Sequence, residues 1–208
     1  MKAVCFDLNK TLIKENSWRD LNLAMNVKSE EDDMLMSWGE RGIITDSQGQ
    51  NILLNIYKES GRHSKDNILK VLSNYTYNDY AKEIIKYLES NGFVIFLISG
   101  SINILVEKIA NELGIKYWKA NNEFVFDKKG YLEKINTLDN DKKAKVFQLK
   151  ELCKETDISI KDVYCVGDGD NDIEIFKVTG KGITFSGSKI EKDAWKVINK
   201  LEDIKDLI

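Results

Sequence analysis

Three short polar segments, each directly after an apolar run, hold most of the residues that could do chemistry in this chain. Asp7-Leu8-Asn9-Lys10-Thr11 follows Val4-Cys5-Phe6, Ser99-Gly100-Ser101 follows the run 93–98, and Gly167-Asp168-Gly169-Asp170-Asn171-Asp172 follows the run 163–166. Ligands of parallel α/β sheets bind beyond the carboxyl ends of the strands. If the apolar runs are strands of such a sheet, the three segments meet at one edge and form one site.

The residue types in these segments suit the transfer of a phosphoryl group. Asp7 and Asp168 offer the hard oxygen ligands that suit Mg²⁺, and the cation would offset the repulsion between a carboxylate nucleophile and a phosphate dianion. Asp7 could then attack phosphorus and form an aspartyl-phosphate. The Ser99 hydroxyl, the Lys145 ammonium and nearby backbone N–H groups would hold the phosphoryl oxygens, and Gly100 lets the backbone approach closely.

The elements that must position these segments follow from the pattern of apolar residues. The pattern predicts a helix that Asn78 or Asp79 caps and Gly92 ends, helices over about 102–113, 141–155 and 201–208, a strand at 183–185, and a hairpin around the turn 127–130. Strands that are apolar throughout and alternate with helices are typical of a parallel sheet covered on both faces. We therefore predict an α/β fold with a Rossmann-like core, a parallel sheet flanked by helices.

Residues 14–78 have a different pattern and predict a helical insertion. They contain short helical patterns such as Trp18/Leu21/Met25 and no convincing strand. The segment Ser29-Glu30-Glu31-Asp32-Asp33 predicts a capped, solvated helix start. We expect two domains, a core of residues 1–13 and 79–208 and a small all-helical cap, residues 14–78, inserted after the first strand.

Composition excludes several classes of protein. The chain has 208 residues, of which 42% are hydrophobic and 31% charged, and this balance suits a folded globular protein. A formal net charge of −3 gives no electrostatic reason to expect a nucleic-acid partner, and a single histidine excludes a multi-histidine zinc site. Cys5, Cys153 and Cys165 form no Cys-x-x-Cys pair, so we expect reduced, buried thiols.

The same reading indicates where the protein works. No uninterrupted apolar stretch approaches the ~20 residues of a membrane-spanning helix, and Asp7 interrupts the N-terminus before a signal-peptide core could form. We expect a cytoplasmic protein, a monomer or homodimer, that meets a small phosphorylated metabolite and neither a membrane nor a nucleic acid.

Each segment alone also has a simpler interpretation. A lone Asp at a strand end usually caps a helix or lies in a turn, and the segment 168–171 alone would be a turn or a fragment of a calcium loop. Lys145 has Lys142 and Lys143 as rivals. A response-regulator receiver uses similar residues in another chain order, with its acidic pair first. All the segments together, each at a strand end or a helix start, favour the functional interpretation.

These motifs resemble those of haloacid-dehalogenase-superfamily phosphatases, nearest to the phosphoserine-phosphatase-like branch with a helical C1 cap. The first motif of that family, Asp-x-Asp-x-Thr after a buried strand, is matched at Asp7 and Thr11. The second is matched at Ser99-Gly100 and the third at Lys145. The fourth, Gly-Asp-Gly-x-Asn-Asp, is matched in full by residues 167–172.

The resemblance implies a role for each matched residue. Asp7 would be the nucleophile and a Mg²⁺ ligand, the Asn9 backbone carbonyl and Asp168 further ligands, and Asp172 would hold metal-bound water. The groups that bind phosphate or substrate would be Thr11, Ser99, Gly100, Lys145 and Asn171. The implied activity is Mg²⁺-dependent hydrolysis of a small phosphomonoester through an aspartyl-phosphate, under a cap that closes over the substrate.

Asn9 departs from the family pattern, which has its general acid/base Asp at this place. An amide cannot shuttle a proton, and general acid–base catalysis contributes about 10²–10⁴ in rate. We therefore expect slow turnover and an aspartyl-phosphate that could accumulate, with Glu15 and Asp170 as candidate substitutes. The alternative is a non-catalytic phosphate-ligand-binding or regulatory protein of the same fold.

The residues that read phosphoserine in the resembling enzymes are not matched. Those enzymes carry an acidic residue shortly after the first motif and an arginine in the cap. Here Asn16 stands at the acidic place, with Glu15 one position early, and the segment 45–52 holds no arginine. The only arginines of the chain are Arg19, Arg41 and Arg62. The predicted substrate is therefore a small phosphomonoester, without support for phosphoserine itself.

Overall fold

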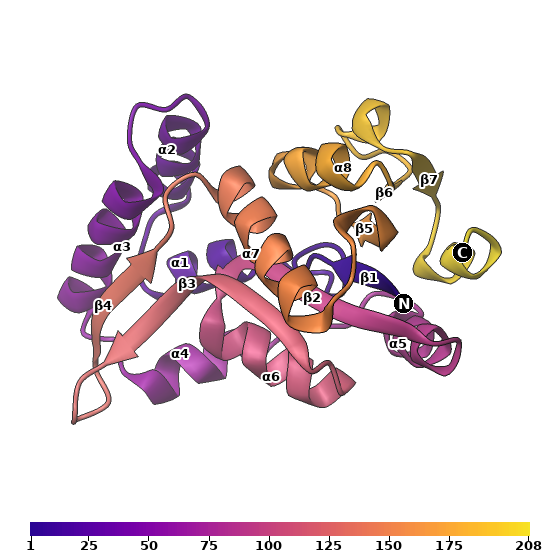
Figure 1. Cartoon of the computed structure of the whole chain (residues 1–208). Coiled ribbons are helices and arrows are strands. Elements are labelled where there is room, and N and C mark those ends of the chain that lie inside the picture. Colours follow the sequence, from indigo (N-terminus) through magenta and orange to yellow (C-terminus); the bar gives the residue numbers. More distant parts are fainter.

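The first strand of the chain lies at the centre of its sheet. The computed structural model describes residues 1–208 and places β1 (Lys2–Phe6) between β2 (Phe93–Ile102) and β5 (Val163–Val166), parallel to both (Figure 1). The strand order is β4-β3-β2-β1-β5-β6-β7, and every neighbouring pair except β3 with β4 is parallel. The carboxyl ends of β1, β2 and β5 therefore meet at one edge.

Helices flank this sheet, and short 3-10 helices lie in the second half of the chain. The remaining strands are β3 (Tyr117–Phe126), β4 (Leu132–Thr137), β6 (Gly182–Phe185) and β7 (Lys196–Ile198). The flanking helices are α5 (Ala81–Ser90), α6 (Asn103–Leu113), α7 (Asp141–Thr156) and α8 (Ile173–Thr179). The 3-10 helices are η1 (Ile160–Asp162), η2 (Asp170–Asp172), η3 (Glu191–Asp193) and η4 (Leu201–Asp206). This is the predicted α/β architecture.

The side chains of β1 alternate between two buried faces of the sheet. Ala3 and Cys5 belong to the hydrophobic cluster that contains residues of α7 and α8. Val4 and Phe6 belong to the larger cluster, with residues of α5 and α6. Successive residues of a strand point to opposite faces, so a strand covered on both sides has no place for a polar residue. This explains why the run 3–6 is apolar throughout.

Three elements differ from the sequence-based predictions. The hairpin expected beside the sheet is part of it, because β3 pairs in parallel with β2 before it pairs with β4. The polar residues Lys119 and Asn121 interrupt the apolar pattern in the first half of β3. β7 was not predicted, since its three residues are too few for a pattern. The predicted closing helix over 201–208 is the 3-10 helix η4, not an α-helix.

The start of α5 also differs from the prediction. Tyr80, with φ 67°, precedes the helix and makes no side-chain cap. The Asn78 amide instead donates to the backbone oxygen of Thr11 at 2.8 Å, and Asp79 pairs with Lys14 at 2.9 Å. Both side chains thus tie the end of the insertion to the loop after β1.

The insertion between β1 and α5 is helical, as predicted. Its helices are α1 (Ser17–Ala24), α2 (Ser29–Glu40), α3 (Asp46–Ser60) and α4 (Lys65–Leu72). They lie together at the end of the sheet formed by β3 and β4 (Figure 1). Lys58 of α3 donates to the backbone oxygen of Glu133 in β4 at 3.0 Å, and the Leu132 N–H donates to the His63 carbonyl at 2.9 Å. The hairpin therefore contacts the insertion.

The acidic start of α2 is less solvated than its sequence predicts. Asp32 is only 3% exposed and accepts from Arg19 at 2.8 Å, while Asp33 accepts from the same guanidinium at 2.5 Å. The Asn22 amide also donates to Asp32, at 2.6 Å. This network holds α1 against α2. It also commits Arg19 to a structural contact.

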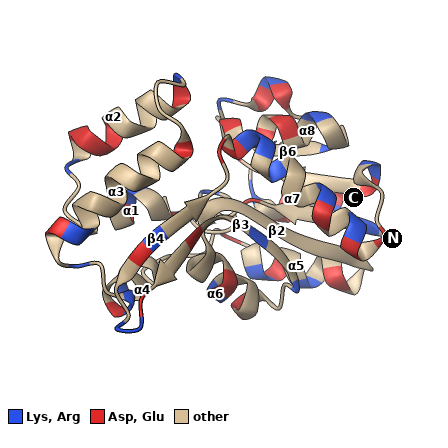
Figure 2. Cartoon of the chain, turned by 60° about the vertical axis from the view of Figure 1, so that its left-hand side comes forward, with Lys and Arg blue, Asp and Glu red and all other residues tan.

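Charges of both signs are interspersed along the outer helices (Figure 2).

The three cysteines are free and buried, in agreement with the prediction. None of the helices has the length and apolar character needed to cross a membrane.

Candidate active site

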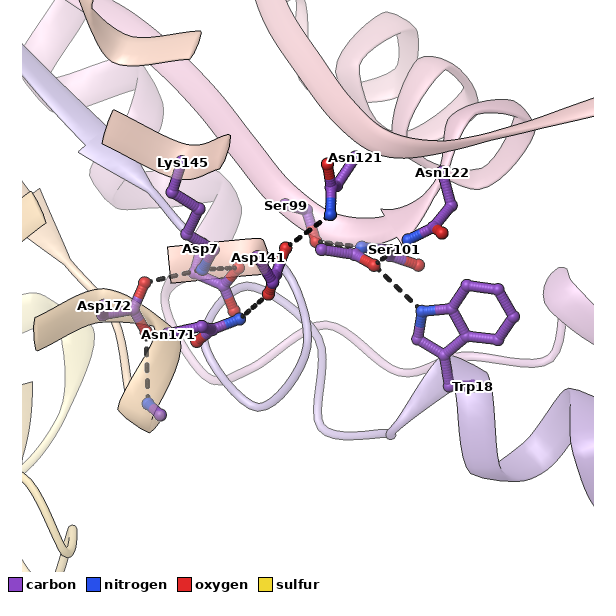
Figure 3. A network of polar contacts seen from close by, with 12 residues as sticks. Asp7, Trp18, Ser99, Ser101, Asn121, Asn122, Asp141, Lys145, Asn171 and Asp172 are labelled. Atoms are coloured by element: carbon purple, nitrogen blue, oxygen red, sulfur yellow. Dashed lines mark hydrogen bonds and ion pairs between the residues drawn. The ribbon is translucent and has the colours of Figure 1, made fainter. Parts of the chain in front are cut away.

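One buried ammonium group joins two of the polar segments. Lys145 of α7 is 1% exposed, and its Nζ donates to Asp7 Oδ1 at 2.7 Å and to Asp172 Oδ1 at 2.6 Å (Figure 3). Asp7 directly follows β1, and Asp172 ends the segment after β5. The structure therefore brings together three residues that lie far apart in the chain. Lys142 and Lys143, the rivals of Lys145, do not contact these carboxylates.

A third carboxylate completes an acidic cluster. One ligand oxygen from each of Asp7, Asp168 and Asp172 lies within 4.8 Å of the others. The two ion pairs of Lys145 leave Asp168 without a partner cation. Three carboxylates around one ammonium group leave an excess of negative charge in a mostly buried place. Hard oxygen donors at this spacing fit a divalent cation such as Mg²⁺.

The pKa values reflect this crowding. Burial raises the pKa of Asp7 from its ordinary 3.8 to about 7, and the charges of Asp172 and Asp168 add to the rise while Lys145 opposes it. Burial and the charge of Asp172 raise the pKa of Asp168 to about 6. Burial alone would lower the pKa of Lys145, but the charges of Asp172 and Asp7 outweigh it and raise that pKa. Perturbed carboxyl groups of this kind cluster at functional sites.

Glycines let the segment after β5 fold tightly around Asp172. The Asp172 Oδ2 atom accepts from the Gly169 N–H at 3.1 Å. A Cβ atom added at Gly167 would lie 2.8 Å from Asp172 Oδ1, closer than side chains approach. The small residue is therefore required for the carboxylate to turn inward toward Lys145.

The Ser99-Gly100 segment connects the site to the insertion. Ser99 Oγ accepts from the Ser101 N–H at 3.1 Å, inside the last part of β2. The carbonyl oxygen of Gly100 accepts from Trp18 Nε1 at 2.9 Å and from Asn122 Nδ2 at 2.8 Å (Figure 3). The first helix of the insertion thus holds the backbone beside the candidate phosphate-binding turn.

Two residues of the loop after β1 make no side-chain hydrogen bond to the acidic cluster. Asn9 Oδ1 accepts from the Ser17 N–H at 3.2 Å, so this side chain lies at the start of α1. Thr11 is 0% exposed, and its hydroxyl has no hydrogen-bond partner. The structure shows no hydrogen bond from Thr11 Oγ1 to any other predicted site residue. Its binding of phosphate stays a prediction.

Asn171 contacts an acidic residue that the sequence analysis placed only as a helix start. Asn171 Nδ2 donates to Asp141 Oδ2 at 2.7 Å, and Asn121 Nδ2 donates to Asp141 Oδ1 at 3.0 Å (Figure 3). Asp141 precedes Lys145 by four residues on α7, and residues at this spacing share a helix face. That spacing was the signal that could have identified Asp141 from the sequence.

This arrangement agrees with a family comparison. A model of haloacid dehalogenase-like hydrolases matches residues 4–177, from the first strand through most of α8. The chain belongs to this family. Within it, the chain is similar to the phosphoserine phosphatase of Methanocaldococcus jannaschii, with 28% identity over 209 residues that cover 100% of this chain and 96% of the relative. It is also 34% identical to the phosphoserine phosphatase of Streptococcus thermophilus over 146 residues, 65% of this chain and 67% of that relative.

Solved structures give the same placement within the haloacid dehalogenase-like hydrolases. A substrate-bound phosphoserine phosphatase complex has a TM-score of 0.82 and 26% identity, and covers 100% of this chain and 98% of its own. A phospho-aspartyl intermediate analogue of phosphoserine phosphatase has the same TM-score and coverages with 27% identity. The protein is thus a phosphoserine-phosphatase-like hydrolase of the family, and its helical insertion is consistent with a C1 cap.

The candidate substitutes for the missing family Asp are engaged away from Asp7. Glu15 accepts from the Thr76 N–H at 2.8 Å, and Asp170 pairs with Lys189 at 2.6 Å. Arg19, the first arginine of the insertion, is held by the acidic start of α2. Each of these three side chains is therefore engaged with a partner outside the acidic cluster.

Proposed function

We propose that this protein is a Mg²⁺-dependent phosphatase that hydrolyses a small phosphomonoester through an aspartyl-phosphate on Asp7. The observation that carries the proposal is the buried contact of Lys145 with Asp7 and Asp172, beside Asp168, at the carboxyl ends of the central strands. A nucleophile, a fixed cation and a cluster of hard oxygen donors are what transfer to a carboxylate requires.

The acidic cluster is the proposed metal site. Asp7, Asp168 and the backbone carbonyl of Asn9 would hold Mg²⁺, and Asp172 would hold water bound to it. The bound cation would offset the negative charge that Asp7 and a phosphate dianion bring together. The donor set supports this role, because one ammonium group does not balance three carboxylates.

The remaining site residues bind and orient the phosphoryl group. Lys145 holds Asp7 in place and favours its ionised form, because its ammonium lies 2.7 Å from the Asp7 carboxylate. Ser99, the Gly100 N–H and Asn171 would donate to phosphoryl oxygens, with Thr11 as a further donor. Asp7 then attacks phosphorus, the ester oxygen leaves, and water hydrolyses the resulting aspartyl-phosphate.

Asn9 makes this reaction slow in our proposal. Its amide offers no proton to the leaving oxygen, and its side chain accepts a hydrogen bond from the start of α1. Asn9→Asp should raise the turnover of a poor leaving group about 10-fold or more, within the range of general acid–base catalysis. Unchanged turnover of phenyl phosphate would show that Asn9 does not limit the rate.

Residues 14–78 form the proposed cap domain. Ser17 and Trp18 at its first helix reach Ser101 and Gly100 of the core, so the cap side is anchored next to the turn that would bind phosphate. A cap in this position excludes water from the site and must open to admit substrate.

The substrate is a small phosphorylated metabolite, for which phosphoserine is one compound to test. The similar proteins named above are phosphoserine phosphatases. Two of the three arginines are engaged elsewhere, since Arg19 bonds Asp32 and Asp33, and Arg62 donates to the Ala24 carbonyl. Arg41, whose side chain makes no hydrogen bond within the protein, is the remaining arginine that could pair with a carboxylate on the substrate.

The deciding experiment is the Mg²⁺-dependent release of p-nitrophenol from p-nitrophenyl phosphate by the wild type and Asp7→Ala. This leaving group needs little protonation, so the reaction depends least on Asn9. We expect turnover that disappears with EDTA and in Asp7→Ala. Turnover at the Asp7→Ala background would instead favour the second candidate function, a non-catalytic phosphate-binding protein, which the presence of Asn9 supports. Mg²⁺-dependent binding of a phosphoester without any phosphoenzyme would establish that alternative.

A further inference from the structure

Asp141 occupies a position in the site that the function proposed above does not use. It is the first residue of α7, and its carboxylate lies between the amides of Asn171 and Asn121 (Figure 3). A Cβ atom added at Gly100 would lie 2.6 Å from Asp141 Oδ2. The carboxylate therefore lies against Gly100 on one side and Asn171 on the other. The Gly100 N–H and Asn171 are two of the groups proposed to bind the phosphoryl oxygens.

The helix places Asp141 on the cap side of the nucleophile. Lys145, one turn further along α7, contacts Asp7. The backbone N–H of Asp141 donates to Asp46 Oδ2 of the insertion at 3.1 Å, so this end of α7 faces the cap. Attacking and leaving oxygens lie roughly in line, so a substrate held between Asp7 and the cap would direct its leaving oxygen toward the side on which Asp141 lies.

Each oxygen of Asp141 accepts one amide hydrogen bond in the structure. A carboxylate oxygen has two lone pairs, so each keeps one that can take a proton. The other carboxylates near the cap are less suited to accept and donate a proton at the site, because each already has a partner. Asp46 caps α7 through the Asp141 N–H, Glu15 bonds the Thr76 N–H, and Asp170 is paired with Lys189.

We propose that Asp141 performs the proton transfers that Asn9 cannot, an inference that rests on the proposed phosphatase function. Asp7 Oδ attacks phosphorus, the P–O bond to the leaving group breaks, and the leaving oxygen takes the proton of the Asp141 carboxyl group to give an alcohol. Water then attacks the aspartyl-phosphate while the Asp141 carboxylate takes a proton from it. The P–O bond to Asp7 breaks, phosphate leaves, and both Asp7 and protonated Asp141 are restored.

The test is a double-mutant cycle of Asp141→Asn and Asn9→Asp, measured with p-nitrophenyl phosphate and phenyl phosphate. We expect Asp141→Asn to lower kcat/KM for phenyl phosphate about 10²-fold, and to lower kcat/KM for p-nitrophenyl phosphate far less. It should also give a burst of p-nitrophenol, with phosphoenzyme that intact-protein mass spectrometry detects. In the Asn9→Asp background the same substitution should have little effect, because a second acid is present, and coupled sites give such non-additive effects.

Several results would overturn the proposal. An equal loss for both substrates would make Asp141 a positioning residue that holds Asn171. Unchanged rates would show that Asp141 takes no part in the reaction. A lower KM with kcat intact would show that the Asp141 carboxylate competes with the substrate phosphate for the site. Asp157→Asn, at the exposed other end of α7, is the matched control and should leave both rates unchanged. The Asn9→Asp/Asp141→Asn double variant shows whether the fold is retained, since it should remain active.

Failure of the proposed function has a different signature. The wild type and Asn9→Asp would then show no Mg²⁺-dependent, Asp7-dependent turnover of either substrate. That result would overturn the phosphatase function and, with it, the role of Asp141.

Discussion

At the scale of single residues, the charge on Asp7 is the most consequential feature of the site. Its carboxylate is buried beside two others, and the Lys145 ammonium is the one cation in direct contact with any of the three carboxylates. Burial raises the pKa of Asp7 to about 7. When no metal is bound, the ionised form of Asp7 therefore destabilises the folded protein, because its charge is buried beside two like charges.

The first prediction concerns this cost in EDTA. A folded-state pKa raised above the unfolded value of 3.8 gives its full stabilisation below pH 3.8 and loses it as the pH rises through about 7. Asp7→Asn removes the ionised form, so it should be more stable than the wild type at pH 8 by on the order of 2–4 kcal/mol, and little different at pH 4. Thermal unfolding in EDTA at both pH values measures this difference.

Its matched control is Asp157→Asn, which is exposed and should give the same change at both pH values. An equal stabilisation by Asp7→Asn at pH 4 and pH 8 would contradict the assignment of the effect to ionisation of Asp7. Addition of Mg²⁺ should stabilise the wild type more than the variant, because the variant lacks one proposed ligand.

The sequence predicted the members of the site better than their partners. Asp7, Asp168 and Asp172 are close together because strand ends of a parallel sheet share an edge, which periodicity reveals, and Lys145 joins them from α7. Asp141 shares a helix face with Lys145, but its partners Asn171 and Asn121 come from other elements, and a single sequence does not display such contacts. The roles of all these residues remain predictions until the variants are measured.

At the scale of elements, β6 and α8 are in contact through one glycine. A Cβ atom added at Gly182 would lie 2.7 Å from the Phe176 Cβ and closer still to the phenyl ring. The strand therefore approaches the helix so closely that only a residue without a side chain fits. Packed interiors respond to an added methyl group with backbone shifts.

The second prediction is that Gly182→Ala destabilises the protein by about 1–3 kcal/mol. Since each kcal/mol shifts Tm by about 2–4 °C in proteins of this size, a thermal unfolding curve resolves the change. Gly39→Ala is the matched control, because Gly39 lies in α2 with nothing within 4 Å of an added Cβ. That substitution should stabilise the protein by about 0.5–1 kcal/mol. Similar Tm changes for both variants would contradict the packing argument.

Elements were predictable where one pattern ran through them. The apolar run 3–6 of β1, the apolar β5 and the glycines that follow α5 and α6 can be recognised in the sequence. The first half of β3 was missed because its polar Asn121 and Asn122 serve contacts with other elements. Tertiary contacts of that kind produce no periodic pattern in the sequence.

At the scale of the whole molecule, Trp18 connects the cap to the core. Its indole N–H donates to the Gly100 carbonyl at 2.9 Å, and its ring packs edge-on against Phe124 with centroids 5.9 Å apart. One side chain thus links α1, the Gly100 backbone in β2 and the hairpin. Motion of the cap has to break this contact or carry it along.

The third prediction is that Trp18→Phe loosens the cap while keeping the apolar packing. Loss of one partly buried hydrogen bond costs about 1 kcal/mol, which corresponds to about a 5-fold change in the closed-to-open ratio. We expect faster hydrogen exchange in residues 17–24 and a few-fold lower kcat/KM for p-nitrophenyl phosphate. Trp38→Phe in α2, whose indole makes no hydrogen bond to the core, should change neither. Unchanged exchange in α1 would argue against a latch at Trp18.

The central place of β1 also has a consequence for biosynthesis. This strand is made before its neighbours β2 and β5, which begin at Phe93 and Val163. A growing chain therefore carries β1, apolar from Ala3 to Phe6, without a partner strand until β2 has been made, and β1 gains its second neighbour only with β5. Contacts between distant residues also slow folding, and exposed strands of this kind are prone to aggregation. The helices of the insertion emerge meanwhile, so the proposed cap is synthesised before the site that it would cover exists.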